Sequence, residues 1–230
     1  MRLATLVQHH PSRADLLPAL LARLPADAMV VTDPDPDGVP NPWRCYRACL
    51  ESVPANATHA LIVQDDAVPH PQFPELASIV VGAKPDRIVV MFHASVPPIS
   101  ARRMGARAHS GHRWSDMNSH ELLPVVATSW PAGIARSFLE WACEHMRPHD
   151  RSDDALASKF IRAKAICPIA TIPSLVQHTD DVPSTIRRKQ TSVRPMPTRS
   201  ALIPYDPDED LTEAGWAPLR DVRVGVNTHV

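Results

Sequence analysis

Short apolar runs alternate with amphipathic segments along most of the chain. Apolar runs rich in β-branched residues are typical of buried strands, and apolar residues three or four positions apart predict helices. The pattern predicts strands at 3–7, 28–32, 60–64, 87–92, 122–128 and 169–172. It predicts helices at 12–24, 43–52, 73–81, 132–145 and 153–165.

This order of elements predicts an α/β fold with a mostly parallel central sheet flanked by helices. Residues 93–121 form a long polar stretch rich in His and Arg, and long loops of this kind are often functional. Beyond residue 178 the periodicity is weak and prolines are frequent. We therefore predict one domain over residues 1–185 and an irregular C-terminal tail over 186–230, basic first and acidic afterwards.

Composition narrows the class of protein. The chain has 230 residues, 44% of them hydrophobic, which is enough for one well-formed core. Its net charge of -1 gives no overall attraction to nucleic acid or membrane. No apolar run approaches the roughly 18 residues of a membrane span, no signal peptide is recognisable, and the four cysteines lack zinc-binding spacing. We expect a cytoplasmic protein without a membrane partner, and the oligomeric state is open.

Several common ligand-binding motifs are missing from the sequence. The seven glycines never form a GxG, so the dinucleotide fingerprint and the P-loop are both absent. No G-x-S-x-G motif of the α/β-hydrolases occurs either. What remains is an α/β pattern with polar residues at strand ends, which is where ligands of such sheets bind.

The most informative of these polar residues are Asp65 and Asp66, directly after the apolar run 60–64. Carboxylates at the edge of a core need partners, and a divalent cation is a natural one because hard cations bind carboxylate oxygens. A pair of loop-capping aspartates explains the pattern equally well. A second pair, Asp153 and Asp154, opens a predicted helix, where plain N-terminal capping is the alternative.

Three segments together resemble the GT-A fold glycosyltransferases. Residues 61–73, Leu-Ile-Val-Gln-Asp-Asp-Ala-Val-Pro-His-Pro-Gln-Phe, resemble the strand-acid-acid segment that holds a divalent metal on the diphosphate of a sugar nucleotide. Residues 152–157 resemble the acidic motif on the acceptor side, and residues 172–178 resemble the closing strand and histidine. The three occur in the family's order, and the resemblance covers about residues 1–185 of the chain. The first triplet position is Gln64 instead of an acid, which leaves weak or absent metal dependence open.

The resemblance implies a single GT-A, Rossmann-like domain that moves a sugar from a nucleotide sugar, most simply a UDP-sugar, to an acceptor hydroxyl. It implies that Asp66 and His178 bind Mn²⁺ or Mg²⁺. It also implies that Asp154, or its neighbour Asp153, accepts the acceptor proton if the reaction inverts the sugar carbon. The residues expected to contact the donor are Gln8, His9, Asp33, Arg44 and Asp65.

A basic stretch of the sequence indicates which class of acceptor the protein would use. Residues 99–113 contain arginines and histidines but no acid, and such clusters hold phosphate backbones. A surface that is solvated, or paired with the acidic residues 206–213, is the alternative. Arginine-rich proteins resembling this family occur in bacteriophages, so DNA carrying 5-hydroxymethylpyrimidine is the leading acceptor, with protein or glycan behind it. The candidate acceptor-binding residues are Arg102, Arg103, Arg107 and Arg113.

Two other classes of function remain open from the sequence. A metal-dependent nucleotidyltransferase on a similar sheet would release pyrophosphate instead of a nucleoside diphosphate. A non-catalytic module that only binds nucleotide sugars is favoured by the amide of Gln64 in place of the first acid.

Overall fold

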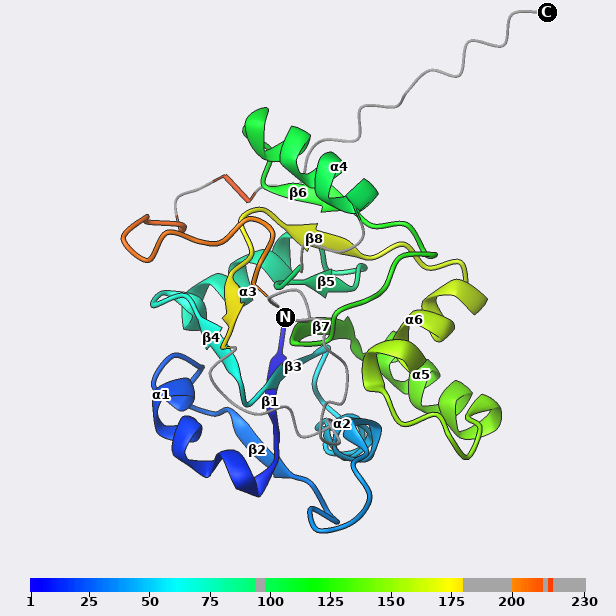
Figure 1. Ribbon diagram of the computed structural model, residues 1–230. Helices are drawn as coiled ribbons and strands as arrows, with labels where there is room; N and C mark the ends of the chain where they lie inside the picture. The colour runs from blue at the N-terminus through cyan, green and yellow to red at the C-terminus, as the bar shows by residue number, and fades with distance from the viewer. Residues whose placement is uncertain (94–97, 180–199, 213–214, 217–230) are drawn as a thin grey trace, which may run out of the picture.

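A mixed seven-stranded sheet forms the centre of the molecule. The computed structural model describes residues 1–93, 98–179, 200–212 and 215–216 (Figure 1). Across the sheet the strands are β2 (Met29–Thr32), β1 (Leu3–His9), β3 (His59–Gln64), β7 (Ala127–Pro131), β5 (Val89–Val90), β8 (Ile169–Thr171) and β6 (Trp114–Asp116). A separate two-stranded sheet pairs β4 (Ala67–Pro69) with β9 (Val176–His178).

The direction of the strands corrects the sequence-based expectation. β1 runs parallel to β2 and β3, and β5 runs parallel to β8. β7, however, is antiparallel to both β3 and β5, and β6 is antiparallel to β8. The α/β class is confirmed, but the expectation of a mostly parallel sheet is wrong. An apolar run shows that a strand is buried on both faces, and it carries no information about the strand's direction.

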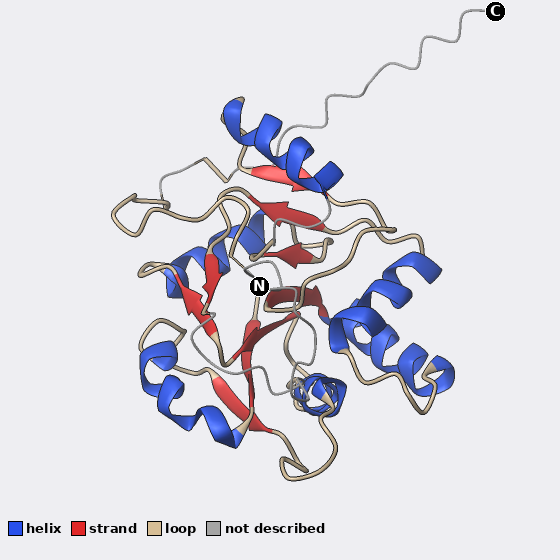
Figure 2. Cartoon of the chain, in the orientation of Figure 1, coloured by secondary structure: helices blue, strands red, loops and turns tan. Residues whose placement is uncertain are grey.

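Helices cover both faces of the sheet (Figure 2). One face packs against α2 (Pro42–Glu51), α5 (Ala132–His145) and α6 (Asp153–Ala163), and the other packs against α1 (Leu17–Leu21) and α3 (Phe73–Ala83). Successive strand residues alternate between these faces. Along β3, Ile62 lies in the core with α2, α5 and α6, whereas Leu61 and Val63 lie in the core with α1 and α3.

The long stretch expected to be a loop contains regular structure. It forms α4 (Pro98–His109) and the edge strand β6. In α4, Met104 is completely buried, while Arg102, Gly105 and Ala106 are exposed. An apolar stripe this narrow gives little helical periodicity in the sequence.

Two other elements differ from the pattern. The single helix expected over 12–24 is a 3-10 helix, η1 (Pro11–Leu16), followed by the short α1. Proline lacks a backbone N–H, so Pro18 interrupts a continuous helical hydrogen-bond ladder and sits in the first turn of the new helix. The strand expected at 122–128 begins later, at Ala127.

Part of the predicted tail belongs to the core. Leu211 and Trp216 are buried, and the ring of Trp216 meets that of Trp114 edge-on with centroids 5.3 Å apart. The hydroxyl of Tyr205 lies 3.2 Å from the carbonyl oxygen of Val68 in β4. The basic residues 187–199 lie outside the described part of the chain. Over the described ranges, no helix combines the length and apolar character that crossing a bilayer requires.

Replacing Leu211, which has no exposed surface, tests whether this C-terminal segment stabilises the domain. Leu211→Ala removes buried methyl groups and leaves a cavity, so we expect the free energy of unfolding to fall by about 2–5 kcal/mol in urea denaturation. Leu122→Ala is the matched control, because Leu122 is 51% exposed. Equal, small effects of the two substitutions would show that the segment adds nothing to stability.

Candidate active site at the carboxyl ends of β1 and β3

A buried ionic cluster forms where β1 and β3 end, and we name it the Arg13 cluster: His9, Arg13, Asp65, Asp66 and His178. Arg13 lies on η1, directly after β1, and is buried together with both aspartates. Its Nη1 atom is 2.7 Å from Oδ1 of Asp65 and 2.7 Å from Oδ2 of Asp66. A single guanidinium nitrogen therefore joins the two carboxylates that the sequence singled out.

Asp65 connects three parts of the backbone. Its Oδ2 lies 3.1 Å from Nδ1 of His9, the last residue of β1, and accepts a 2.7 Å hydrogen bond from the backbone N–H of His10. Its Oδ1 accepts from Arg13. Hydrogen bonds to an ionised carboxylate are short and strong, so Asp65 holds the end of β1 and η1 against the end of β3.

Asp66 is joined to His178 across the small sheet. β4 follows Asp66 directly, and its pairing with β9 places Ala67 opposite His178. As a result, Nε2 of His178 is 3.1 Å from Oδ2 of Asp66, although the two residues are far apart in the sequence. Burial raises the pKa of Asp66, but the hydrogen bond and charge of His178 and the charge of Arg13 outweigh burial and lower it. The carboxylate is therefore ionised at neutral pH.

The cluster gives a divalent metal a poor fit as it is arranged. Oδ1 of Asp66 is buried and accepts no hydrogen bond among the described residues, so one ligand atom is open. Oδ2, however, is already contacted by Arg13 and His178. Over the described ranges, no group of three or more His, Cys, Asp or Glu side chains is placed to hold a metal. The assignment of Mn²⁺ or Mg²⁺ to Asp66 and His178 thus stays a sequence-based prediction.

A second polar cluster lies on the opposite face of the same sheet edge, and we name it the Asp153 cluster: Gln8, Gln64 and Asp153. Gln8 and Gln64 are direct neighbours in the β1–β3 pairing, so both side chains are on one face. Nε2 of Gln8 donates to Oδ2 of Asp153 at 3.0 Å, and Nε2 of Gln64 reaches the same oxygen at 3.3 Å. An acid at position 64 would place a second carboxylate there, so an amide at this position suits the buried Asp153.

The environment of Asp153 raises its pKa to about 6, mainly through burial and also through the charge of Asp154, against the hydrogen bond from Gln8. Asp154 has a different role. Its Oδ1 accepts a 2.7 Å hydrogen bond from the backbone N–H of Ala155 and contacts the Ser152 hydroxyl. Asp154 therefore caps the first turn of α6, and Asp153 is the carboxylate with the pKa of a general base.

Asp33 and Arg44, expected to contact the donor, bind each other. Nε and Nη2 of Arg44 donate to the two oxygens of Asp33 at 2.6 and 2.9 Å, and Nη1 lies 3.1 Å from Oδ2 of Asp35. Burial raises the pKa of Asp33, but the hydrogen bond and charge of Arg44, together with the hydrogen bond from the backbone N–H of Asp35, outweigh burial and lower the pKa. The bidentate pair fixes the loop between β2 and α2. Their contact with a donor stays a prediction.

The four candidate acceptor-binding arginines fall into two groups. Arg103 forms a bidentate pair with Glu121 at 2.8 and 2.9 Å, and Arg113 pairs with Glu209 at 3.0 Å. Among the described residues, Arg102 and Arg107 are paired with no carboxylate. The predicted pairing with residues 206–213 therefore holds for Arg113, whereas Arg103 pairs with Glu121 instead.

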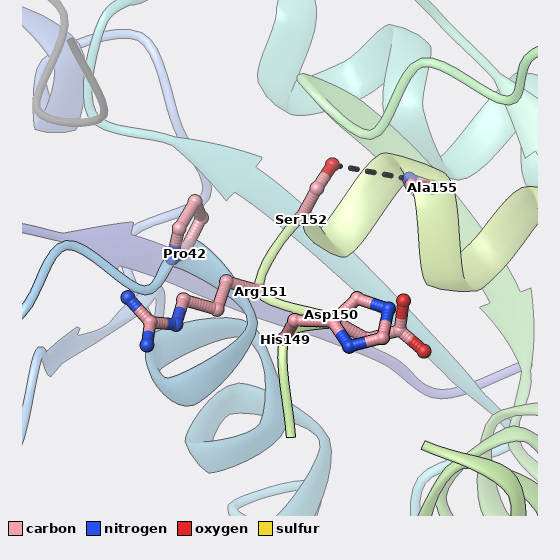
Figure 3. Close-up of a pocket in the computed structure, with 6 residues that line it drawn as sticks. All are labelled: Pro42, His149, Asp150, Arg151, Ser152 and Ala155. Atoms are coloured by element: carbon pink, nitrogen blue, oxygen red, sulfur yellow. Dashed lines mark hydrogen bonds between the residues drawn. The ribbon is translucent and has the colours of Figure 1, made fainter. Parts of the chain in front are cut away.

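A cavity of about 230 Å³ opens beside the Asp153 cluster, between the first turns of α2 and α6 (Figure 3). Its wall includes Ser152 and Ala155, which flank the Asp153–Asp154 pair, and Pro42, whose carbonyl oxygen accepts from Gln8. No sequence pattern indicates this cavity, because it forms only where two helices meet. The lining residues are Pro42, His149, Asp150, Arg151, Ser152 and Ala155.

No protein-family model and no curated protein matches this sequence.

Replacing Asp153 by Asn tests whether burial raises the pKa of the Asp153 carboxyl group. Its folded-state pKa of about 6 lies above the ordinary 3.8, so the folded protein binds this proton more tightly than the unfolded chain does. Stability therefore decreases as pH rises from about 4 to about 6, and the ionised group is fully destabilising above that window. We expect Asp153→Asn to raise the free energy of unfolding by up to about 3 kcal/mol well above pH 6 and by little near pH 4.

Urea denaturation over this pH range measures the effect. The control is Asp27→Asn, because Asp27 is exposed. A stability gain for Asp153→Asn that does not change with pH would contradict the raised pKa.

Proposed function

We propose that this protein is a glycosyltransferase that moves a sugar from a nucleotide sugar, with UDP-sugars as the first candidates, to an acceptor hydroxyl. The observation that carries the proposal is the 3.1 Å contact between Asp66 and His178. These are the two residues that the GT-A resemblance assigns to one site, and the pairing of β4 with β9 brings them together from distant parts of the chain. The mixed α/β sheet is compatible with the same resemblance.

The position of the site also supports the proposal. Ligands of α/β sheets bind beyond the carboxyl ends of parallel strands, and β1 and β3 are parallel and end side by side. The Arg13 cluster would face the donor at this edge. The cavity beside Asp153 would take the acceptor, because its wall includes both neighbours of the Asp153–Asp154 pair.

The chemistry follows from these positions. The acceptor oxygen forms a bond to the anomeric carbon of the sugar while the bond from that carbon to the diphosphate breaks. The proton of the acceptor hydroxyl goes to the Asp153 carboxylate, and the electron pair leaves with the nucleoside diphosphate. A pKa of about 6 leaves most Asp153 side chains ionised and able to accept a proton at neutral pH. A direct displacement of this kind inverts the anomeric configuration.

A donor panel tests the proposal. UDP-, GDP-, CMP- and dTDP-sugars are added to the protein with and without Mn²⁺, and the melting temperature and the products are followed. We expect one class of donor to raise the melting temperature and to be converted to its nucleoside phosphate. Release of pyrophosphate would instead support a nucleotidyltransferase. Stabilisation by a donor without turnover would support the non-catalytic module, and no response to any donor would contradict the proposal.

Separate substitutions of Asp153 and Asp154 show which residue is the general base and which only caps α6. We expect Asp153→Asn to lower kcat by about 10²–10⁴-fold, since a general base contributes that much, while the donor still raises the melting temperature. Asp154→Asn keeps a side-chain oxygen at the start of α6 and should change kcat only a few-fold. Loss of activity in Asp154→Asn with activity retained in Asp153→Asn would reverse the assignment.

DNA is proposed as the acceptor on the basis of Arg102 and Arg107, the two arginines of the stretch that pair with no carboxylate over the described ranges. We expect the double substitution of Arg102 and Arg107 by Ala to reduce the slope of log K against log salt for duplex DNA by about 2, which is roughly 0.9 per lost phosphate contact. Arg136→Ala, on the exposed side of α5, is the control. Binding to DNA that is absent or insensitive to salt would favour a protein or glycan acceptor.

A further inference from the structure

We propose that the Arg13 guanidinium is the resident cation of the Asp65–Asp66 pair, in the place that a divalent metal would otherwise take. Its Nη1 atom contacts two carboxylates, Asp65 and Asp66, and each carboxylate also contacts an imidazole, His9 for Asp65 and His178 for Asp66. Carboxylate and imidazole are ordinary ligands of divalent transition metals. In this protein the two carboxylates instead meet at a nitrogen of the chain itself.

Distances support this assignment. Nη1 of Arg13 is 2.7 Å from an oxygen of each aspartate, which is the position from which one cation bridges two carboxylates. A metal at the same place would need to lie about 2.0–2.6 Å from those oxygens. The guanidinium nitrogen and a metal ion exclude each other from that volume.

The charges lead to the same conclusion. The Arg13 guanidinium already offsets one of the two carboxylate charges. A divalent ion added beside Arg13 would make three positive charges against two negative ones in a buried site, where charges without partners are costly. A guanidinium stays protonated in proteins, so the arginine is a permanent cation. The occupancy of a metal, in contrast, depends on its concentration.

The one carboxylate oxygen that is still open does not make the cluster a metal site. Oδ1 of Asp66 is buried and accepts no hydrogen bond among the described residues, so it offers one ligand. Mg²⁺ requires six ligands in near-octahedral geometry, and most of them would have to come from elsewhere. The consequence for activity rests on the proposed function: donor binding and turnover proceed in EDTA.

Metal binding without any sugar nucleotide tests the occupancy of the site, so its result is independent of the donor panel. The melting temperature is measured for the wild-type protein and for Arg13→Ala, each in EDTA and with increasing MnCl₂. We expect no response from the wild type. Arg13→Ala should melt lower in EDTA and gain roughly 5 °C at a Mn²⁺ concentration on the order of 100 times its Kd, because Mn²⁺ enters the vacated place.

The control variant is Arg44→Ala, which also removes an arginine from an aspartate pair, Asp33 and Asp35. Asp35 is 62% exposed, so this pair is solvated and should show no comparable gain. The double variant with Arg13→Ala and Asp66→Asn should lose the gain.

Three results would overturn the proposal. The first is stabilisation of the wild type by Mn²⁺ that Asp66→Asn abolishes. The second is a folded Arg13→Ala that gains no Mn²⁺ response. The third is an equal gain in Arg44→Ala. If Arg13→Ala does not fold, electron paramagnetic resonance of Mn²⁺ with the wild type decides. No bound Mn²⁺ supports Arg13 as the resident cation, and one equivalent that Asp66→Asn removes overturns it.

Discussion

The contact between one arginine nitrogen and two buried carboxylates is the interaction on which the rest of this site depends. Asp65 and Asp66 leave β3 inside the protein, where unpaired charges cost several kcal/mol each. Arg13 offsets that cost from η1, and Asp65 in turn ties η1 and the end of β1 to β3. Removing the guanidinium would leave two adjacent buried charges. Both the local fold and the electrostatics of the site therefore depend on Arg13.

The same sheet edge carries two different environments. Strand alternation sends Gln8 and Gln64 to one face and His9 and Asp65 to the other. On the first face, amides surround Asp153 and its pKa is raised. On the second, Arg13 and His178 contact Asp66 and its pKa is lowered. Two carboxylates with shifted pKa values of opposite sign are typical of a site that divides proton transfer and charge stabilisation between separate residues.

The sequence predicted the parts of the fold that depend on local patterns. The expected helix over 132–145 coincides with α5, because its apolar face is broad and regular. Strand direction depends on distant partners, so the pattern predicts a mostly parallel sheet although β7 is antiparallel to both of its neighbours. The helix α4 was missed because Met104 is its one buried hydrophobic residue among those whose burial is described.

The sequence indicates which residues form the candidate site, but it does not indicate which of them contact one another. Burial of Asp65 and Asp66 follows from their place after an apolar run, but their partner does not. Arg13 lies on a 3-10 helix, which gives no periodic signal, and it reaches the aspartates only once β1 and β3 are paired. Gln64 looked like a departure from an acidic triplet. Its role beside Asp153 depends on the approach of α6, which the sequence does not show.

On the proposed function, the donor binds at the Arg13 cluster and the protein supplies the cation there. The decisive measurement is nuclear magnetic resonance of the arginine Nε–Hε groups during titration with the stabilising nucleotide sugar in EDTA. We expect the Arg13 signal to shift in proportion to donor bound, with backbone shifts at His10 and His178. Donor-induced shifts confined to the cavity between α2 and α6, or shifts at Arg13 that require Mn²⁺, would contradict it.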